Sequence, residues 1–361
     1  MQYHLVLTER CNKHCTYCGG TRHINGIPLD VTYPVDTLVS FIKQDPDPVI
    51  GFYGGEPLLA LDYMYQVMDK VPAKAYTLQT NATKLNLIKD KYLHRLHSIL
   101  VSIDGGKKVT DSCRGEGTYE QVTSNLLEIE NRGYSGDIIA RMAFSKNGDI
   151  YRDVSHLLEM EEPYFDHVHW QLDVFWSILD SWSDLEGWLK RYESGVSRLV
   201  TDFTESFKTG APLGIVPFLP VLKTLLTGEE TPHIRCGAGA TSFAILTNGR
   251  IEACPIAPEL PYSNVGDIND SSPSEIRESI PVGSPCTECD VLGICGGRCL
   301  FANKNKFWGI DWFNRICETT KHMINEVRTC VPTARRLIDE GVLDSRVFDY
   351  PEINNGCEII P

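Results

Sequence analysis

Short apolar segments alternate with amphipathic helical segments from the N-terminus to about residue 180. Six of the apolar segments are predicted strands: Tyr3–Thr8, Val49–Tyr53, Ala75–Thr80, Ser98–Ile103, Asp137–Phe144 and His167–Leu172. Segments between them carry apolar residues at every third or fourth position and are predicted helices, chiefly Val35–Lys43, Leu61–Lys70, Tyr119–Asn131 and Ile150–Glu161. This alternation is typical of βα units with a parallel sheet. Six units are two short of a full barrel, so the sequence predicts an α/β fold with a partial, laterally open (β/α)6 barrel of the TIM type.

Three cysteines follow the first predicted strand within eight residues, in the run Cys-Asn-Lys-His-Cys-Thr-Tyr-Cys. Cys11, Cys15 and Cys18 can hold three irons of a cubane iron–sulfur cluster, which leaves the fourth iron without a protein ligand. A structural zinc or disulfide cluster is the alternative. Structural zinc takes four ligands, however, and no fourth cysteine lies nearby. The spacing therefore favours an iron–sulfur cluster with one open iron.

The C-x3-C-x2-C spacing after a first strand resembles the signature of the radical S-adenosylmethionine (SAM) superfamily. The resemblance implies that the open iron chelates the amino and carboxylate groups of SAM, and it makes Tyr17 a cofactor-binding candidate. The turn Gly54-Gly55-Glu56 after the second strand is similar to the Gly-Gly-Glu motif of that family. In the family, the backbone and the acid of this motif meet the methionine amino group, and glycines let the backbone approach a ligand closely.

Polar residues at the ends of the third and fourth strands are further site candidates. The resemblance implies that Gln79, Asn81, Ser102 and Asp104 line the cofactor or substrate cavity, although helix caps or turns would explain them equally well. Arg141 lies inside an apolar strand, where a guanidinium needs an anionic partner. The family reading supplies the cofactor carboxylate, and a structural ion pair is the alternative.

Cys113 follows the fourth strand by about ten residues. It is a candidate donor of a hydrogen atom to a substrate radical, and the alternative is an ordinary small buried residue. Cys330 and Cys357 have no predicted role beyond helix packing and the C-terminal tail.

Seven more cysteines lie in the C-terminal part of the chain, at positions 236, 254, 286, 289, 295, 299 and 317. Together with Gly249, which precedes Cys254 by four intervening residues, their spacing resembles that of the SPASM domain, an extension that carries auxiliary clusters in peptide- and protein-modifying radical enzymes. The resemblance implies that Cys286, Cys289, Cys295 and Cys317 hold one auxiliary cluster. Cys236, Cys254 and Cys299 would hold the other. A zinc ribbon is the alternative for the stretch from Cys286 to Cys299.

The second auxiliary set has only three thiols, because the residues just before Cys236 include no further cysteine. Either one iron of that cluster is open, or His233 or a substrate thiol completes it.

Composition divides the chain into four predicted parts: a barrel at 1–180, a helical bridging segment at 181–232, the SPASM domain at 233–320 and a C-terminal helix and tail at 321–361. The bridge contains two helical stretches separated by a break at Pro217 to Pro220. A hairpin is predicted from Phe243–Leu246 and Arg250–Ala253, because Asn-Gly between two apolar runs is a strong hairpin signal. Helix is expected from about Glu318 to Glu340, interrupted near Pro332. Four tryptophans from Trp170 to Trp188 fit core packing better than substrate stacking.

The net charge of −14 disfavours nucleic acid as a partner, since binding to phosphates relies on Lys and Arg. No apolar run approaches the ~18 residues that span a bilayer, so no membrane role is predicted. The thirteen cysteines belong to a chain of 361 residues that opens directly on a strand, without a signal segment. Reduced thiols and a cytoplasmic location are therefore expected.

These features predict a radical SAM enzyme with three 4Fe-4S clusters. It would cleave SAM reductively to a 5′-deoxyadenosyl radical and remove hydrogen from a peptide or protein substrate, with a flavodoxin- or ferredoxin-like electron donor. The first strand begins at residue 3, so we expect no recognition module before the barrel. A separate leader-recognition protein or the bridging segment would then hold the substrate.

Three other functions remain open from the sequence. Oxidation of the kind catalysed by an anaerobic sulfatase maturase is disfavoured, because Pro255 stands after Cys254 where that subfamily has an acidic residue. A small-molecule tailoring enzyme would share the same motifs. A multi-cluster electron carrier would have no use for Gly54-Gly55-Glu56 or Arg141.

Overall fold

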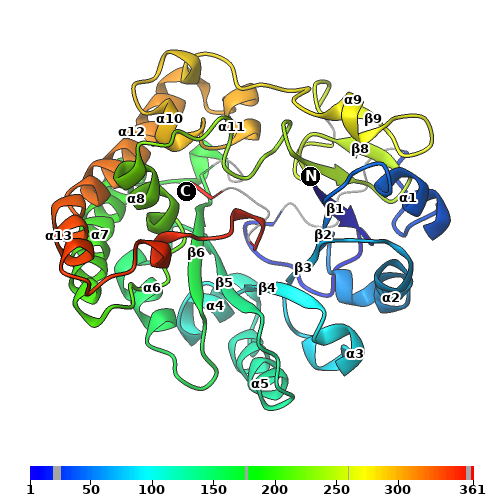
Figure 1. The fold of residues 1–361 in the computed structure, drawn as a ribbon, viewed down its shortest axis with the longest axis horizontal. Helices are drawn as coiled ribbons and strands as arrows, with labels where there is room; N and C mark the ends of the chain where they lie inside the picture. Colours follow the sequence, from blue (N-terminus) through cyan, green and yellow to red (C-terminus); the bar gives the residue numbers. More distant parts are fainter. Residues whose placement is uncertain (19–25, 175–177, 259, 355–358) are drawn as a thin grey trace.

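The computed structural model describes residues 1–18, 26–174, 178–258, 260–354 and 359–361. In these residues nine strands form one sheet, in the order β6-β5-β4-β3-β2-β1-β7-β8-β9. The strands are β1 Gln2–Val6, β2 Val49–Tyr53, β3 Ala75–Thr80, β4 Leu96–Ser102, β5 Asp137–Phe144, β6 His167–Leu172, β7 Ser242–Ile245, β8 Arg250–Glu252 and β9 Asn264–Asp267. The sheet curves around the centre of the molecule and helices lie outside it (Figure 1).

Strands β1 to β6 are parallel neighbours in sequence order, which confirms the predicted partial barrel. β1 is buried along its whole length, as expected for a parallel strand covered on both faces. It ends at Val6 rather than at Thr8, because Thr8 forms an isolated bridge with Asp30. β4 begins two residues earlier than predicted, where a register shift in β3 lets Leu96 pair with Tyr76.

Helices of the barrel and bridge cover the outside of the sheet. They are α1 Val35–Ile42, α2 Leu61–Lys70, α3 Asp90–Leu93, α4 Lys107–Arg114, α5 Thr118–Asn131, α6 Ile150–Leu158, α7 Leu185–Ser206 and α8 Phe218–Thr227. α6 ends at Leu158 instead of Glu161, because Glu161 turns back to bridge Tyr164. The predicted break falls before α8: Pro217 precedes the helix and Pro220 lies in its first turn, where a missing N–H is tolerated.

The C-terminal helices are short around the cysteines and long after them: α9 Pro273–Ile276, α10 Leu292–Cys295, α11 Leu300–Asn305, α12 Gly309–Arg328 and α13 Val331–Asp339. α12 begins well before the predicted Glu318. It packs along α7, where the Arg315 guanidinium binds the carboxylates of Glu186 and Glu193. The interruption lies between Arg328 and Val331, and Pro332 occupies the first turn of α13.

The predicted hairpin does not stand apart from the barrel. β7 pairs in parallel with β1, with Gln2 opposite Ser242 and Leu5 opposite Ile245. β8 and the unpredicted β9 then continue the sheet in antiparallel fashion. The cysteine-rich region and the barrel are therefore joined by main-chain hydrogen bonds along one sheet.

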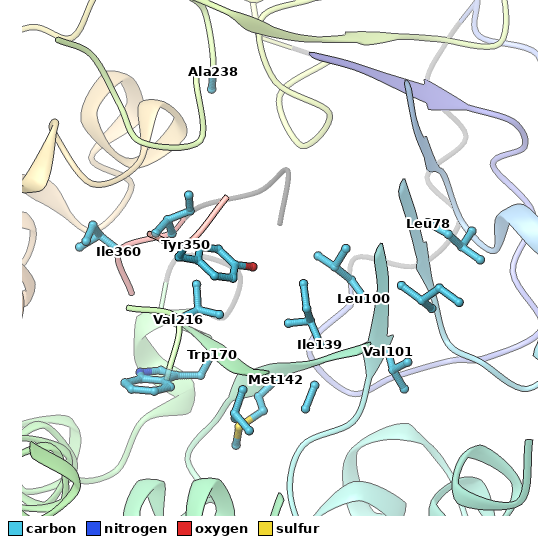
Figure 2. Close-up of a cluster of buried hydrophobic side chains, with 14 of the residues drawn as sticks. Leu78, Leu100, Val101, Ile139, Met142, Trp170, Val216, Ala238, Tyr350 and Ile360 are labelled. Carbon is cyan, nitrogen blue, oxygen red and sulfur yellow. The ribbon is translucent and has the colours of Figure 1, made fainter. Parts of the chain in front are cut away.

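Residues 350–354 cover the end of the barrel where the strands begin. Gln2 Nε2 donates to Ile353 O (3.1 Å), Ser98 Oγ to Asn354 O (2.7 Å), and Asn354 Nδ2 to Asp137 Oδ2 (2.8 Å). Tyr350 and Ile360 pack with apolar side chains of the barrel interior (Figure 2). The predicted tail is thus part of the core, although Cys357 lies outside the described residues.

The tryptophans among the described residues pack against other side chains of the core, as the sequence analysis predicted. Trp170 is fully buried and its indole N–H donates to Tyr192 Oη (3.0 Å), while Trp188 stacks on Phe144. Trp182 meets Trp188 edge to face. Trp176 lies outside the described residues. Among the helices that are described, none combines the length and the apolar character needed to cross a membrane.

Substituting Asn354→Ala should lower the free energy of unfolding by about 1–3 kcal/mol, because Asp137 Oδ2 loses the hydrogen bond that Asn354 Nδ2 donates to it. Equilibrium urea unfolding measures the change. The exposed Asn147→Ala serves as the matched control. Equal stabilities for the two variants would show that the contact of Asn354 with Asp137 does not hold the segment in place.

Candidate active site and cluster-binding regions

The loop after β1 brings Cys11, Cys15 and Cys18 close enough for their thiols to influence one another electrostatically. Burial raises the pKa of Cys11 and of Cys15, and the neighbouring thiols raise both further. Two amides donate toward the Cys11 sulfur, the backbone N–H of Lys13 (3.4 Å) and Asn81 Nδ2 (3.8 Å). Three soft thiols with N–H donors around them fit an iron–sulfur cluster, since thiolates select such clusters and N–H groups stabilise their charge.

The Gly54-Gly55 turn packs against the backbone of the cluster loop. A Cβ on Gly54 would lie 2.3 Å from Thr8 O, and one on Gly55 would lie 2.3 Å from Arg10 O. Gly55 N donates to Thr8 O and Glu56 N to Arg10 O, both at 2.8 Å. The glycines therefore allow β2 to approach the loop that carries the cysteines.

The Glu56 side chain is fully buried and turned toward the strand ends. Its carboxylate accepts from Leu58 N (3.0 Å), Thr80 Oγ1 (2.7 Å) and Asn81 N (2.8 Å). Burial raises the pKa of Glu56, and these hydrogen bonds oppose the rise. In this structure Glu56 ties β2 to β3, and its contact with the cofactor amino group stays a prediction.

Asp104 forms a buried ion pair with Arg114, a residue that the sequence analysis did not single out. Arg114 Nε and Nη2 each donate to one Asp104 oxygen at 2.8 Å. Tyr17 Oη (2.6 Å) and Ala143 N (2.9 Å) donate to the same carboxylate. Asp104 is therefore neither a helix cap nor a wall of the cavity described below: it ties the cluster loop to β4, α4 and β5.

A cavity of about 290 Å³ opens at the carboxyl ends of the strands. Four of the predicted cofactor-binding residues line it, Tyr17, Gln79, Ser102 and Arg141, and so does the predicted cluster ligand Cys18. Arg141 is almost completely buried and lies in register with Ser102 of β4. The described lining does not include the predicted Gly54, Gly55, Glu56, Asn81, Asp104 or Cys113.

Two carboxylic acids that the sequence analysis missed also line this cavity, Glu9 and Asp173. Asp173 follows β6 directly, and its backbone N–H donates to Phe144 O (3.0 Å). The pKa of Asp173 is raised to about 7, chiefly by burial; the negative charge of Asp104 contributes to the rise, and Lys146 opposes it. The only sequence signal for Asp173 was its place, as an acid at the carboxyl end of a parallel strand.

Cys113 lies in α4 with its thiol buried away from the cavity. Its sulfur is 3.7 Å from Ser145 Oγ and 3.8 Å from Ser112 Oγ, and its carbonyl accepts from Thr16 N (2.9 Å). These contacts match the alternative of a small buried residue that supports the cluster loop.

The structure also groups the C-terminal cysteines. The Cys286, Cys289, Cys295 and Cys317 thiols lie near one another, and burial first, then their mutual repulsion, raises the pKa of Cys295 to about 12. Burial raises the pKa of Cys317 to about 11. Thiols with such pKa values must be deprotonated to bind metal, so metal binding there would release protons.

Of the three-cysteine set, Cys254 and Cys299 both lie near Tyr262. Burial raises the pKa of Tyr262 to about 12, and the charges of these two thiols act in the same direction. Cys236 and His233 line a second cavity of about 220 Å³. Pro255 and Ile256, which follow Cys254 directly, line the first cavity, as Cys18 does.

Among the described residues, no three His, Cys, Asp or Glu side chains gather tightly enough around one point for a single metal ion. In a four-iron cluster each thiolate binds a different iron, so its cysteines stand farther apart than the ligands of one ion.

The fold and the site define the class of protein: a parallel partial barrel with a three-cysteine loop, of which Cys18 lines the cavity at the carboxyl ends of the strands. Residues 5–148 match the family model described as the radical SAM superfamily. The chain therefore carries a radical SAM domain over these residues.

Among known sequences, the chain is similar to a cysteine-type anaerobic sulfatase-maturating enzyme of Clostridium perfringens, with 23% identity over 352 residues that cover 86% of this chain and 91% of the relative. It is also similar to a GTP 3′,8-cyclase of Sulfurimonas denitrificans, with 30% identity over 138 residues that cover 34% of this chain and 41% of the relative.

Among solved structures, native anSMEcpe with bound AdoMet and Cp18Cys peptide has a TM-score of 0.71 at 19% identity, covering 93% of this chain and 100% of that chain. Streptococcus suis SuiB bound to its precursor peptide SuiA has a TM-score of 0.54 at 17% identity, covering 84% of this chain and 73% of that chain. At these identities the likeness is one of fold.

Substituting Gly55→Ala should remove the iron of one 4Fe-4S cluster, because the added methyl group would displace the Arg10 carbonyl and the cysteine loop with it. Iron and sulfide analysis after anaerobic reconstitution measures the loss. Gly106→Ala is the control, since its Cβ would make only ordinary contacts with His156, the nearest at 3.7 Å. Full iron content in the Gly55 variant would contradict the packing argument.

Proposed function

We propose that this enzyme uses SAM and three 4Fe-4S clusters to modify a peptide or protein substrate. The observation that carries the proposal is the shared cavity: Cys18 of the first cysteine loop and Pro255 and Ile256 of the Cys254 loop line the same space. A substrate held there would lie between the radical-generating site and an auxiliary site.

Cys11, Cys15 and Cys18 would hold the SAM cluster. The chemistry that this cluster would supply, with SAM bound, is one-electron reductive cleavage of SAM. The role of the chain is to bind and orient. Arg141 would bind the cofactor carboxylate, Gln79, Ser102 and Tyr17 would accept or donate hydrogen bonds to its polar groups, and Glu56 would act through the turn that it holds.

The apolar wall of Pro255, Ile256 and Met142 would exclude water from the reacting carbon. Cys286, Cys289, Cys295 and Cys317 would hold one auxiliary cluster, and Cys236, Cys254 and Cys299 the other. His233 shares a cavity with Cys236, which supports it as a candidate for the missing ligand, and an open iron that takes a substrate thiol is the other possibility. An external flavodoxin- or ferredoxin-like donor and a separate leader-recognition protein complete the proposal, in the cytoplasm.

A peptide substrate is supported by the relatives rather than by this chain alone. Three of the similar structures contain a bound peptide, Cp18Cys or Kp18Cys in anSMEcpe and SuiA in SuiB. The similarity over most of the chain to a cysteine-type sulfatase-maturating enzyme favours oxidation of a peptide cysteine as a second candidate reaction. Pro255 after Cys254 counts against it.

The test is an anaerobic assay of the reconstituted enzyme with SAM and a reductant. The peptide panel contains the Cp18Cys and Kp18Cys peptides and synthetic peptides encoded by small reading frames next to the gene. We expect 5′-deoxyadenosine above background and a mass change with at least one neighbouring peptide. A cluster spectrum that responds to SAM, without either product for any peptide, would refute the proposal.

Removing Cys317 should cost the iron of one auxiliary cluster, whereas removing Cys330 should cost none. Cys317→Ala takes one thiol from the four-cysteine group, while Cys330 is buried beside Thr204, with Sγ 3.1 Å from Oγ1. Iron content and Mössbauer spectra of the reconstituted variants measure the difference. Equal iron in both variants would overturn the assignment of Cys317.

The rate of a modification that removes a proton from a substrate nitrogen, oxygen or sulfur should increase as pH rises through about 7. The Asp173 carboxyl, with its pKa raised to about 7 mainly by burial, accepts a proton only in its ionised form, which dominates above that pH. Asp173→Asn should slow product formation by about 100- to 10,000-fold and remove this limb of the profile. The pH profile of product formation, measured beside SAM-induced changes in the cluster spectrum, checks the prediction.

Lys146→Met provides the directional check, because loss of a cation that lowers the Asp173 pKa should move the limb to higher pH. The exposed Asp180→Asn serves as the control and should leave the profile in place. An unchanged profile in Asp173→Asn would assign the proton transfer to another group, Glu9 being the other acid in the cavity.

A further inference from the structure

Asn303 makes three directed hydrogen bonds although its side chain is almost completely buried. Its Oδ1 accepts from Gly283 N (2.8 Å), and its Nδ2 donates to Gly283 O (2.9 Å) and to Cys286 Sγ (3.3 Å). An amide nitrogen has two hydrogens, so both are used, one on a carbonyl and one on a thiol sulfur.

The position of Asn303 connects the two groups of C-terminal cysteines. α11 begins directly after Cys299, and the backbone N–H of Asn303 donates to Cys299 O (2.9 Å). The main chain of this residue is therefore anchored to one proposed auxiliary site while its side chain reaches a sulfur of the other.

A purely structural role would need only the pair of bonds to Gly283, which already fixes the 283–286 turn against α11. The third bond has a different consequence. An N–H group directed at a cysteine sulfur stabilises negative charge on that sulfur, and a cluster carries one more negative charge after reduction. Hydrogen bonds to the sulfurs are among the factors that set the potentials of iron–sulfur clusters, and partners outside the ligand set tune the metal.

We propose that Asn303 is a positioning residue that raises the reduction potential of the auxiliary cluster held by Cys286, Cys289, Cys295 and Cys317. The higher potential suits that site to receiving an electron. The inference rests on the cluster assignment of the proposed function and adds to it a residue that tunes the potential of one auxiliary site.

The experiment is a redox titration of the anaerobically reconstituted full-length protein, followed by electron paramagnetic resonance, without SAM or peptide. Asn303→Asp keeps an acceptor for Gly283 N–H and removes the donor to sulfur. Asn305→Asp is the matched control: it lies on the same helix, adds the same charge, and its amide donates to Tyr262 Oη (2.9 Å) and Phe301 O (2.7 Å). We expect the midpoint of one auxiliary signal to move to a more negative potential in Asn303→Asp, and by much less in Asn305→Asp.

A second measurement does not depend on the stability of any variant. In wild-type protein labelled with asparagine carrying ¹⁵N in the side-chain amide, electron–nuclear double resonance should detect a nitrogen coupled to that auxiliary cluster. Equal shifts in the two variants, or no such coupling, would overturn the role of Asn303. If Cys317→Ala instead retains all its iron, the cluster assignment fails, and the two failures are thereby distinguished.

Discussion

The buried ion pair between Asp104 and Arg114 connects the cysteine loop to the helix and the strands beside the cavity. Removing two charges from water is costly unless their hydrogen bonds are well satisfied, and here the Asp104 carboxylate also accepts from Tyr17 and Ala143. The four donors come from the cysteine loop, α4 and β5. One carboxylate thus aligns the loop that would bind iron with the strands that line the cavity, and its negative charge also raises the pKa of Asp173.

Two groups of residues can be distinguished around this ion pair. One group holds the cysteine loop in place, and the other lines the cavity and would contact a ligand. Gly54, Gly55 and Glu56 fit the family motif in the sequence, and Asn81 was a candidate for lining the cavity. In the structure all four support the cysteine loop and the ends of β2 and β3. The cavity itself presents other groups, including a guanidinium and two carboxyls at its wall. The supporting residues therefore fix the position of the cysteine loop, as the residues around a functional site must do for the groups that bind a ligand.

The sequence predicted the six barrel strands and the hairpin because both have local signals, apolar runs and an Asn-Gly turn. It did not predict that β7 would pair with β1, since parallel pairing between segments more than two hundred residues apart has no local signature. α4 was missed because its polar run Lys-Lys-Val-Thr-Asp-Ser-Cys-Arg has few apolar positions, and Arg114 was missed with it. β9, with the sequence Asn-Val-Gly-Asp, was missed because three of its four residues are of types that are depleted in strands.

The part of the site that could be predicted from the sequence is the set of cysteines, because the spacing of thiols indicates what kind of metal group they can bind. Cysteine spacing pointed to three groups of thiols, and the structure places the members of the N-terminal group and of the four-cysteine C-terminal group near one another. Asp173, Glu9 and Asn303, in contrast, stand in no motif. A carboxyl at the end of a strand or an amide on a short helix acquires a role only through what the fold brings next to it. Such residues can be recognised as functional candidates only when their burial and hydrogen bonds are known.

The pairing of β7 with β1 also determines how the protein can be divided. A fragment that stopped at the end of the barrel strands would leave β1, buried along its whole length, as an exposed sheet edge with a free row of N–H and C=O groups. Apolar edges of that kind associate with other chains. The cysteine-rich region therefore protects the barrel from aggregation, independently of any metal that it binds.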